Sequence, residues 1–390
     1  MRTPDAGLTA GSPMSERQNA EVAFLFLGEM LLIPHLYPIV EALGTAAPDL
    51  PMDLWVSTSM HEGLLAGWRP PGRVRIRRAP GFHQLPDAVP GTNPPLPAKM
   101  PMLARLAPAL ARTPVAVCAE QTSLWLPRLL PLKTRFVKTS HGVGSMSARD
   151  DKRRRAAFFT MVPSERERAT YLQRGMNPQR IAATGYVKAA FRHRTATRPR
   201  FPEARPVLLY TPHWRAERSS WPVWGQEIVT MLAAQDRYNV ILAPHQRLVE
   251  TCPGVRGALA AVADLPHMHC DLDSFAMVDG SYTAAADLYL GDTSSQLLEF
   301  LMTPRPAVFL NTHETDWPSD PSYDMWGAGE VVTRAEDIMA AIARAPQRHA
   351  DYIAFQQSYA ESALGDTSGA AAARAAEQIL RILAMPAGGR

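Results

Sequence analysis

The segment Asp292-Thr293-Ser294-Ser295 places a carboxylate and three hydroxyl groups after an apolar run and directly before an amphipathic helical pattern. The first backbone N–H groups of a helix have no partner inside the helix and lie at the positive end of its dipole. We therefore predict that this segment binds a phosphate or pyrophosphate. Ser and Thr are also ordinary N-cap residues, so simple capping of the helix is the alternative interpretation.

A second segment places His141 between a hydroxyl residue and the two glycines Gly142 and Gly144, just after a strand-like run. Histidine has an ordinary pKa of about 6.5, so it can accept a proton from a hydroxyl group near neutral pH. The glycines leave room for a substrate to approach the backbone. We predict that His141 is a catalytic base; a histidine that only hydrogen-bonds within its own turn is the alternative.

Two segments in the second half of the chain repeat this arrangement. One strand-like run ends in His213, Trp214 and Arg215, and another is followed by His245. A guanidinium group forms paired hydrogen bonds to phosphate, so we predict that Arg215 binds a phosphate. Trp214 is expected to pack against a base or in the core. Histidines from both halves of the chain would suit a proton-accepting role and a phosphate-stabilising role in one shared cleft.

Glu29 and His35 follow the first strand-like run and are second-tier candidates for the same cleft. Ligands of open α/β sheets bind at the carboxyl ends of the strands, where both residues are expected to lie. An ordinary loop role is the alternative for each. The turn at Gly28 lacks the GxGxxG pattern, so a nicotinamide cofactor is not predicted.

Strand-like runs alternate with helical patterns, which is typical of parallel sheets covered by helices. The predicted strands are residues 22–27, 52–57, 114–118, 135–139 and 157–162, then 206–210, 238–242, 268–270, 288–291 and 307–310. At 390 residues, two domains are expected. The predicted fold class is α/β, with two Rossmann-like parallel-sheet domains facing an interdomain cleft.

The predicted domain boundaries follow changes in composition. The expected parts are a flexible tail at residues 1–20, a first domain at 21–190, a linker at 191–205, a second domain at 206–345 and a helical tail at 346–390. The linker is rich in arginine and contains prolines, which suits a connection better than a core element. Just before it, the turn at Gly185 and Tyr186 is predicted to reach the interdomain crevice.

Composition limits the classes of protein and partner. A hydrophobic share of 46% and a charged share of 20% describe a globular protein with a net charge of +4. Two basic clusters, at residues 69–78 and 149–155, suit an anionic membrane surface or polymer, or simply a solvated face. No nucleic-acid-binding signature accompanies them, so nucleic acid is not a predicted partner.

The cysteines and the most apolar segment indicate where the protein works. Three cysteines without CxxC spacing favour neither a disulfide framework nor a zinc site, and they fit a reducing cytoplasm. Residues 23–40 are the most apolar, but Glu29, Pro34 and His35 interrupt them, so they are not predicted to span a membrane. The expected location is cytoplasmic, with peripheral contact to the inner face of the cytoplasmic membrane.

In their order along the chain, these motifs resemble the CDP-glycerol glycerophosphotransferases of teichoic acid and capsule synthesis. The motifs are His141-Gly-Val-Gly144, Asp151-Lys152 with the following arginines, Val162-Pro-Ser-Glu-Arg166, Thr184-Gly-Tyr186, Tyr210-Thr-Pro-His-Trp-Arg215, Pro244-His245 and Asp292-Thr-Ser-Ser295. The resemblance covers roughly residues 130–330 and implies a GT-B fold with a cytidine diphosphate donor bound mainly by the second domain. It also implies catalytic roles for His141 and His245, and diphosphate contact for Ser294 and Ser295.

The leading prediction is a transferase that moves glycerol phosphate, or a related polyol phosphate, from a CDP-alcohol to a polymer or lipid-linked hydroxyl. Neither a metal nor a cofactor beyond the donor is predicted. Three alternatives stay open: a glycosyltransferase of the same fold that uses a UDP- or GDP-linked sugar, a non-hydrolysing sugar-nucleotide epimerase, and a non-catalytic binding protein. The epimerase would need several carboxylates around the sugar, which these motifs do not supply. The sequence departs from the family pattern at Gln246, at Val187 and in the segment Gly291-Asp-Thr-Ser-Ser295, which lacks the usual aromatic residue.

Overall fold

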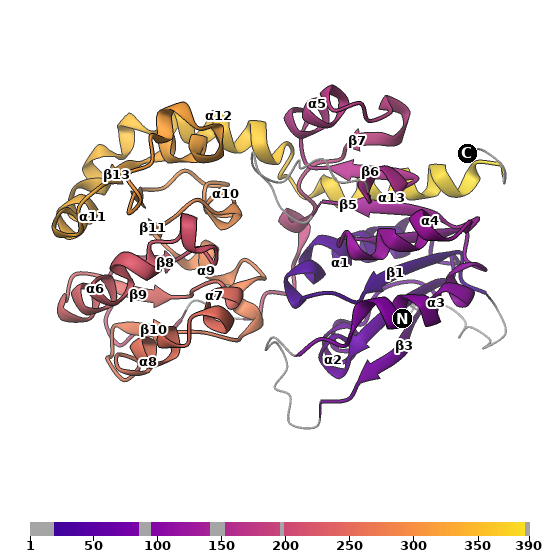
Figure 1. Cartoon of the computed structure of the whole chain (residues 1–390), viewed down its shortest axis with the longest axis horizontal. Coiled ribbons are helices and arrows are strands. Elements are labelled where there is room, and N and C mark those ends of the chain that lie inside the picture. The colour runs from indigo at the N-terminus through magenta and orange to yellow at the C-terminus, as the bar shows by residue number, and fades with distance from the viewer. Residues whose placement is uncertain (1–18, 86–94, 141–152, 196–198, 387–390) are drawn as a thin grey trace, which may run out of the picture.

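The computed structural model describes residues 19–85, 95–140, 153–195 and 199–386, which form two α/β domains (Figure 1). The predicted residues His141, Gly142 and Gly144 lie outside the described residues.

The first domain is built on a parallel sheet that has seven strands among the described residues, in the order β3-β2-β1-β4-β5-β6-β7. The strands are β1 (Val22–Phe26), β2 (Met52–Thr58), β3 (Val74–His83), β4 (Val115–Cys118), β5 (Arg135–Thr139), β6 (Phe159–Val162) and β7 (Ile181–Ala183). The strand order reverses between β1 and β4, so a crevice at their carboxyl ends is the expected ligand position.

The second domain repeats this design. Its described strands form a parallel sheet in the order β10-β9-β8-β11-β12-β13. They are β8 (Val207–Thr211), β9 (Asn239–Leu242), β10 (Met268–Cys270), β11 (Leu288–Gly291), β12 (Ala307–Leu310) and β13 (Glu330–Val332). Here the order reverses between β8 and β11. The predicted fold class, two parallel-sheet α/β domains, is confirmed.

Helices cover both faces of each sheet (Figure 1). The α-helices are α1 (Ile33–Ala46), α2 (Ser59–Trp68), α3 (Lys99–Leu110), α4 (Trp125–Leu129), α5 (Glu165–Gln173), α6 (Trp221–Ala234), α7 (Gln246–Thr251), α8 (Gly254–Ala260), α9 (Ser281–Ala285), α10 (Ser295–Phe300), α11 (Ile338–Arg348), α12 (Ile353–Leu364) and α13 (Ala370–Ala384). The 3-10 helices are η1 (Met30–Leu32), η2 (Thr122–Leu124), η3 (Arg154–Ala156), η4 (Pro178–Arg180), η5 (Val187–Ala190), η6 (Ala216–Arg218), η7 (Phe275–Met277), η8 (Trp317–Ser319), η9 (Pro321–Ala328), η10 (Ala335–Asp337) and η11 (His349–Asp351).

The central strands of both sheets have almost continuously apolar sequences because they are buried on both faces of the sheet. In β1, Phe24 packs into the core on one face of the sheet and Leu25 into the core on the other. In β8, Leu209 and Leu208 divide in the same way. Alternate side chains of a strand point to opposite faces, so each sheet holds two cores.

The C-terminal helix α13 returns to the first domain and packs against α1 and η5 (Figure 1). Its buried face includes Ala375 and Ile379, which join the core under β1. Helix α12 instead packs against η9 of the second domain and α5 of the first. The end of the chain therefore ties the two domains together.

Every predicted strand is present, with ends within two residues of the expected positions. Strands β3, β7 and β13 were not predicted. Residues 275–285 form two short helices, η7 and α9, because Gly280 between them adopts a left-handed conformation with φ +88°.

The first basic cluster lies largely on β3, at the edge of the first sheet. Arg75 and Arg77 form ion pairs with Asp53 of β2, at 2.8 and 3.2 Å. Arg78 pairs with Glu62 of α2 at 2.9 Å. Three of these arginines are thus paired with carboxylates of the same domain. This pairing weakens the prediction that the cluster binds anionic lipid.

Among the described residues, no helix has both the length and the apolar character needed to cross a membrane.

Candidate active site

The loops after β8 and β9 bring together three of the predicted site residues. His213 lies in the loop after β8, and His245 follows β9 and forms the N-cap of α7. Their ring centroids are 6.5 Å apart, and Trp214 lies 5.9 Å from His213 and 6.2 Å from His245. We call His213, Trp214, Arg215, His245 and Arg247 the histidine site.

Both imidazoles of the histidine site use Nδ1 as a hydrogen-bond acceptor. Nδ1 of His213 accepts from the backbone N–H of Arg215 at 3.1 Å, and Nδ1 of His245 accepts from the backbone N–H of Arg247 at 3.2 Å. A neutral imidazole whose Nδ1 accepts carries its proton on Nε2. Each ring therefore offers an N–H donor and no free basic nitrogen.

Burial keeps both rings uncharged. It lowers the pKa of His213 to about 4, assisted by the positive charges of Arg218 and Arg215. Burial also lowers the pKa of His245 to about 3, with further contributions from His213 and Arg247. Both histidines are neutral hydrogen-bond donors at physiological pH, which suits contact with phosphate oxygens better than proton abstraction.

Two arginines contact the indole ring of Trp214. The guanidinium carbon of Arg215 lies 4.8 Å from the ring centroid, and that of Arg247 lies 5.0 Å away. Such cation–π contacts hold a guanidinium in place while its N–H groups remain able to bind an anion. Arg247 was not predicted; its position two residues after His245 was the available signal in the sequence.

Asp292 positions the histidine site from beneath. Its side chain is fully buried, and Oδ2 accepts hydrogen bonds from the backbone N–H groups of His213 at 2.8 Å and Ser220 at 3.0 Å. Burial raises the pKa of Asp292 to about 7. The predicted diphosphate contact is therefore corrected, because a buried carboxylate that accepts from two backbone groups holds the loop and does not face a ligand.

The hydroxyl residues after Asp292 have separate partners. The buried Thr293 hydroxyl donates to the Ser322 carbonyl at 3.3 Å and contacts the Met325 sulfur at 3.4 Å. Ser294 Oγ accepts from the backbone N–H of Gln296 at 3.2 Å and so caps α10. Ser295 is the first residue of α10 and is half-buried. Capping by Ser294 is observed, and contact of Ser294 or Ser295 with a diphosphate stays a prediction.

Glu29 joins the first domain to the histidine site. It follows β1, and its Oε1 lies 2.6 Å from Nη2 of Arg247 in α7. The turn that carries Glu29 is held from behind by the buried His61, whose Nε2 lies 3.0 Å from the Gly28 carbonyl oxygen. The predicted second-tier residue Glu29 therefore does lie at the domain interface.

Three further residues that were predicted to reach the cleft, His35, Gly185 and Tyr186, lie in a different part of the structure. The ring of His35 packs edge-on against Tyr186, with centroids 5.7 Å apart, and the Tyr186 hydroxyl donates to Glu299 of α10 at 2.7 Å. A Cβ on Gly185 would lie 2.6 Å from the Arg374 guanidinium, so this glycine makes room for the C-terminal segment. Tyr186 thus contacts the second domain through Glu299, and none of these three residues is part of the histidine site.

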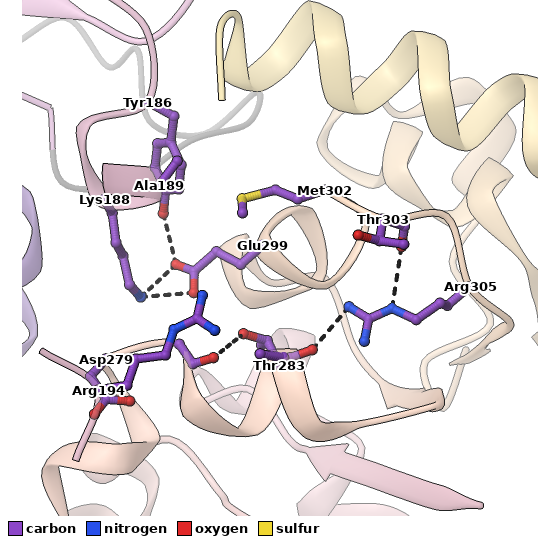
Figure 2. A pocket seen from close by; sticks show the side chains of 12 residues that line it. Tyr186, Lys188, Ala189, Arg194, Asp279, Thr283, Glu299, Met302, Thr303 and Arg305 are labelled. Carbon is purple, nitrogen blue, oxygen red and sulfur yellow. Dashed lines mark hydrogen bonds and ion pairs between the residues drawn. The ribbon is translucent and has the colours of Figure 1, made fainter. Parts of the chain in front are cut away.

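A pocket of about 350 Å³ lies beside this contact and shares no residue with the histidine site (Figure 2). Tyr186 and Lys188 of the first domain meet Glu299 on one wall, where Lys188 Nζ lies 2.7 Å from both carboxylate oxygens. Arg194 and Arg305 contribute further positive charge to the lining. Tyr186 is the one predicted site residue that lines it.

At the corresponding crevice of the first domain, the structure places a buried carboxylate that was not predicted. Glu120 follows β4, forms an ion pair with Lys99 and accepts from the Ser123 hydroxyl at 3.0 Å. A Cβ on Gly28 would lie 2.8 Å from the Glu120 carboxylate, so a larger residue in the turn after β1 would require the Glu120 side chain to shift. The signal in the sequence was a carboxylate directly after a predicted strand.

In the described part of the chain, no group of three or more His, Cys, Asp or Glu side chains is arranged to hold a metal ion.

Solved structures with the same arrangement include the wall teichoic acid polymerase TagF, with a TM-score of 0.63 and 13% identity over 93% of this chain and 88% of that chain. A putative UDP-N-acetylglucosamine 2-epimerase from Listeria monocytogenes has a TM-score of 0.59 and 12% identity over 90% of this chain and 94% of that chain. The UDP-GlcNAc 2-epimerase from Neisseria meningitidis, bound to UDP-GlcNAc, has a TM-score of 0.54 and 10% identity over 94% of this chain and 99% of that chain.

No protein-family model and no curated protein matches the sequence. At 10–13% identity, the likeness to solved structures shows the fold, which is the GT-B arrangement that the resemblance in the motifs implied.

Proposed function

We propose that this protein is a transferase that moves glycerol phosphate, or a related polyol phosphate, from a CDP-alcohol to a hydroxyl group of a polymer or lipid-linked acceptor. The observation that carries the proposal is the histidine site, where two neutral N–H donors and two guanidinium groups lie together at the carboxyl ends of β8 and β9. The shared fold with TagF, which has also been solved after a soak with CDPG, supports it.

In the proposed reaction, an acceptor oxygen attacks the β-phosphorus of the donor and the bond from that phosphorus to the CMP oxygen breaks. The proton of the acceptor hydroxyl passes to His141, and CMP leaves as the phosphate monoester. The Nε2–H groups of His213 and His245 donate to the phosphoryl oxygens, where negative charge is redistributed in the transition state. Arg215 binds the charge that remains on the leaving CMP.

The low pKa values of the two second-domain histidines fit these roles. With pKa values of about 4 and about 3, both rings stay neutral throughout the range in which His141 would act as a base. Proton abstraction and phosphate binding are thereby assigned to different histidines. This division predicts that loss of His141 changes turnover and leaves donor binding nearly unchanged.

Calorimetric titration of the purified chain with CDP, CMP, UDP and GDP tests the proposal. CDP or CMP is expected to bind more tightly than UDP or GDP, and Arg215→Gln is expected to weaken CDP binding about 10-fold by removing a charged phosphate ligand. Preference for UDP or GDP, or binding of none of the four, contradicts the proposed donor.

A nucleotide-sugar enzyme is the second candidate, because UDP-GlcNAc 2-epimerases share the fold and Glu120 supplies a carboxylate at the first-domain crevice. Incubation with UDP-GlcNAc, followed by proton NMR of the sugar, separates the two candidates. Appearance of the C2 epimer would support the epimerase, and unchanged UDP-GlcNAc is the result expected from the CDP-alcohol transferase.

A further inference from the structure

One of the two arginines of the histidine site forms an ion pair with a carboxylate of the first domain. Oε1 of Glu29 lies 2.6 Å from Nη2 and 3.2 Å from Nε of Arg247. Arg215, the other arginine on Trp214, forms no ion pair with a described side chain. The two cations therefore differ in one respect: Arg247 is paired across the domain interface.

Arg247 has the position of a phosphate ligand. Its backbone N–H is bound by His245 Nδ1, so the residue is fixed next to an imidazole whose Nε2–H is a donor. Its guanidinium lies 5.0 Å from the Trp214 ring centroid, and Arg215 lies at a similar distance from the same ring. An anion bound between His213 and His245 would therefore lie beside two guanidinium groups.

The existing ion pair is easily exchanged. The side chains of Arg247 and Glu29 are 45% and 27% exposed, and ion pairs of this exposure contribute little to stability. A diphosphate carries more negative charge than a carboxylate and binds guanidinium with two parallel hydrogen bonds. A diphosphate-bearing ligand therefore competes well for Arg247.

We propose that Arg247 is a second ligand for the donor diphosphate and that Glu29 acts as its placeholder, occupying the guanidinium until the donor displaces it. The exchange breaks an ion pair between the turn after β1 and α7. Donor binding would thus release a contact between the first and second domains. The donor can break this ion pair only if it binds more tightly to the state in which Arg247 is free than to the state in which Arg247 is paired with Glu29. The inference rests on the proposed function for the identity of the donor.

The test measures the affinity of CDP and of inorganic pyrophosphate by calorimetry for the wild type and for E29Q, R247Q and E29Q/R247Q. Removing the competitor in E29Q is expected to tighten binding about 3-fold, the equivalent of about 0.6 kcal/mol, which is within the value of an exposed pair. R247Q is expected to weaken binding about 10-fold. The double variant is expected to match R247Q, because Glu29 acts only through Arg247.

A matched control is available in a second exposed ion pair between the domains. Arg166 of α5 lies 3.0 Å from Asp324 of η9, and the two side chains are 42% and 36% exposed. D324N removes this interdomain contact without touching the histidine site, so its affinities are expected to stay within about 2-fold of the wild type.

The inference is overturned if E29Q binds no more tightly than D324N, or if R247Q binds as tightly as the wild type. Equal gains in E29Q and D324N would mean that loosening the domains, and not freeing Arg247, improves binding. Pyrophosphate separates this test from the proposed function. The expected pattern with pyrophosphate but no preference for CDP over UDP would retain the role of Arg247 and reject the CDP donor. Absence of binding by both probes would reject the two proposals together.

Discussion

The two sheets have the same strand order around their central reversal, yet the chemistry at their carboxyl ends differs. After β1 the chain places Gly28 and Glu29, whereas after β8 it places His213 and its neighbours. After β4 the carboxylate of Glu120 pairs with Lys99, whereas after β11 the carboxylate of Asp292 is buried. The first edge thus presents carboxylates and the second presents N–H donors and cations. This comparison supports the proposal that an anionic donor binds at the second domain.

The two central carboxylates also stabilise their crevices in different ways. Glu120 accepts from the side chains of Lys99 and Ser123, and it lies against the turn of Gly28. Asp292 accepts from two backbone N–H groups of the segment after β8, those of His213 and Ser220. Asp292 therefore holds the backbone of the histidine site in place.

The largest effect is expected for Asp292→Ala, which leaves two buried N–H groups without an acceptor. The free energy of unfolding should fall by about 2–4 kcal/mol, measured by urea denaturation. Asp292→Asn keeps an acceptor oxygen and should lose clearly less. In the first domain, Glu120→Gln keeps an acceptor oxygen for the Ser123 hydroxyl, so its loss in free energy of unfolding should also be smaller than that of Asp292→Ala. Equal unfolding midpoints for Asp292→Ala and Asp292→Asn would contradict the anchoring role.

His245→Asn is expected to separate the two roles of His245 in the histidine site, capping of α7 and donation of a hydrogen bond in the reaction. The Asn oxygen can still accept from the backbone N–H of Arg247, so the cap of α7 and the melting temperature should be retained. Loss of the Nε2–H donor should lower turnover about 10–100-fold. His245→Ala should show the same kinetic loss and also lose about 1 kcal/mol of stability. Turnover of His245→Asn at the wild-type level would exclude His245 from the reaction.

The pH dependence of stability should report the buried histidines of both domains. Burial lowers the folded-state pKa of His213 and of His61 to about 4, below the ordinary 6.5, so the unfolded state binds protons first. Their contribution is present above pH 6.5 and is lost as pH falls toward 4. Asp292 has the opposite sign, because its pKa is raised to about 7 and its contribution is lost as pH rises through that value.

The stability difference between pH 7 and pH 5 should therefore be smaller in His213→Asn and in His61→Asn than in the wild type. Urea denaturation at the two pH values measures it. Reference to the wild type removes the contribution of Asp292, which is common to all three proteins. An unchanged difference in His213→Asn would mean that the ring is charged in the folded state.

The smallest effects are expected from the two serine caps. Ser164 caps α5 in the first domain and Ser294 caps α10 in the second, each by accepting from a backbone N–H. Replacing either serine with alanine should cost about 1 kcal/mol. If Ser294 also contacts the diphosphate, Ser294→Ala alone should weaken CDP binding. Equal losses of stability with unchanged CDP affinity in both variants would reduce Ser294 to a cap.

The strands were predictable because most are buried on both faces and read as short apolar runs. Strand β3 escaped because it lies at the sheet edge, where Arg75 and Arg77 alternate with apolar residues and look like a basic surface cluster. Strands β7 and β13 are each three residues long, which is too short for a periodic pattern.

The grouping of residues in the histidine site was predictable in part because His213, Arg215 and His245 each follow a strand closely. What the sequence lacks is the partner of each side chain. The pairing of Arg247 with Glu29 joins residues 218 positions apart, and the burial of Asp292 depends on a loop from a different strand. Such contacts follow from the fold and cannot be obtained from local spacing.

The proposed reaction requires that the second domain holds a CDP-alcohol for attack at phosphorus. Phosphorus NMR of the wild type with CDP-glycerol and a glycerol phosphate oligomer as acceptor tests it most directly. The diphosphate signals should disappear while CMP and a new phosphodiester form in equal amounts, and product formation should be about 100-fold slower in His141→Ala. Persistence of the diphosphate signals in the wild type, under conditions where CDP binds, would contradict it.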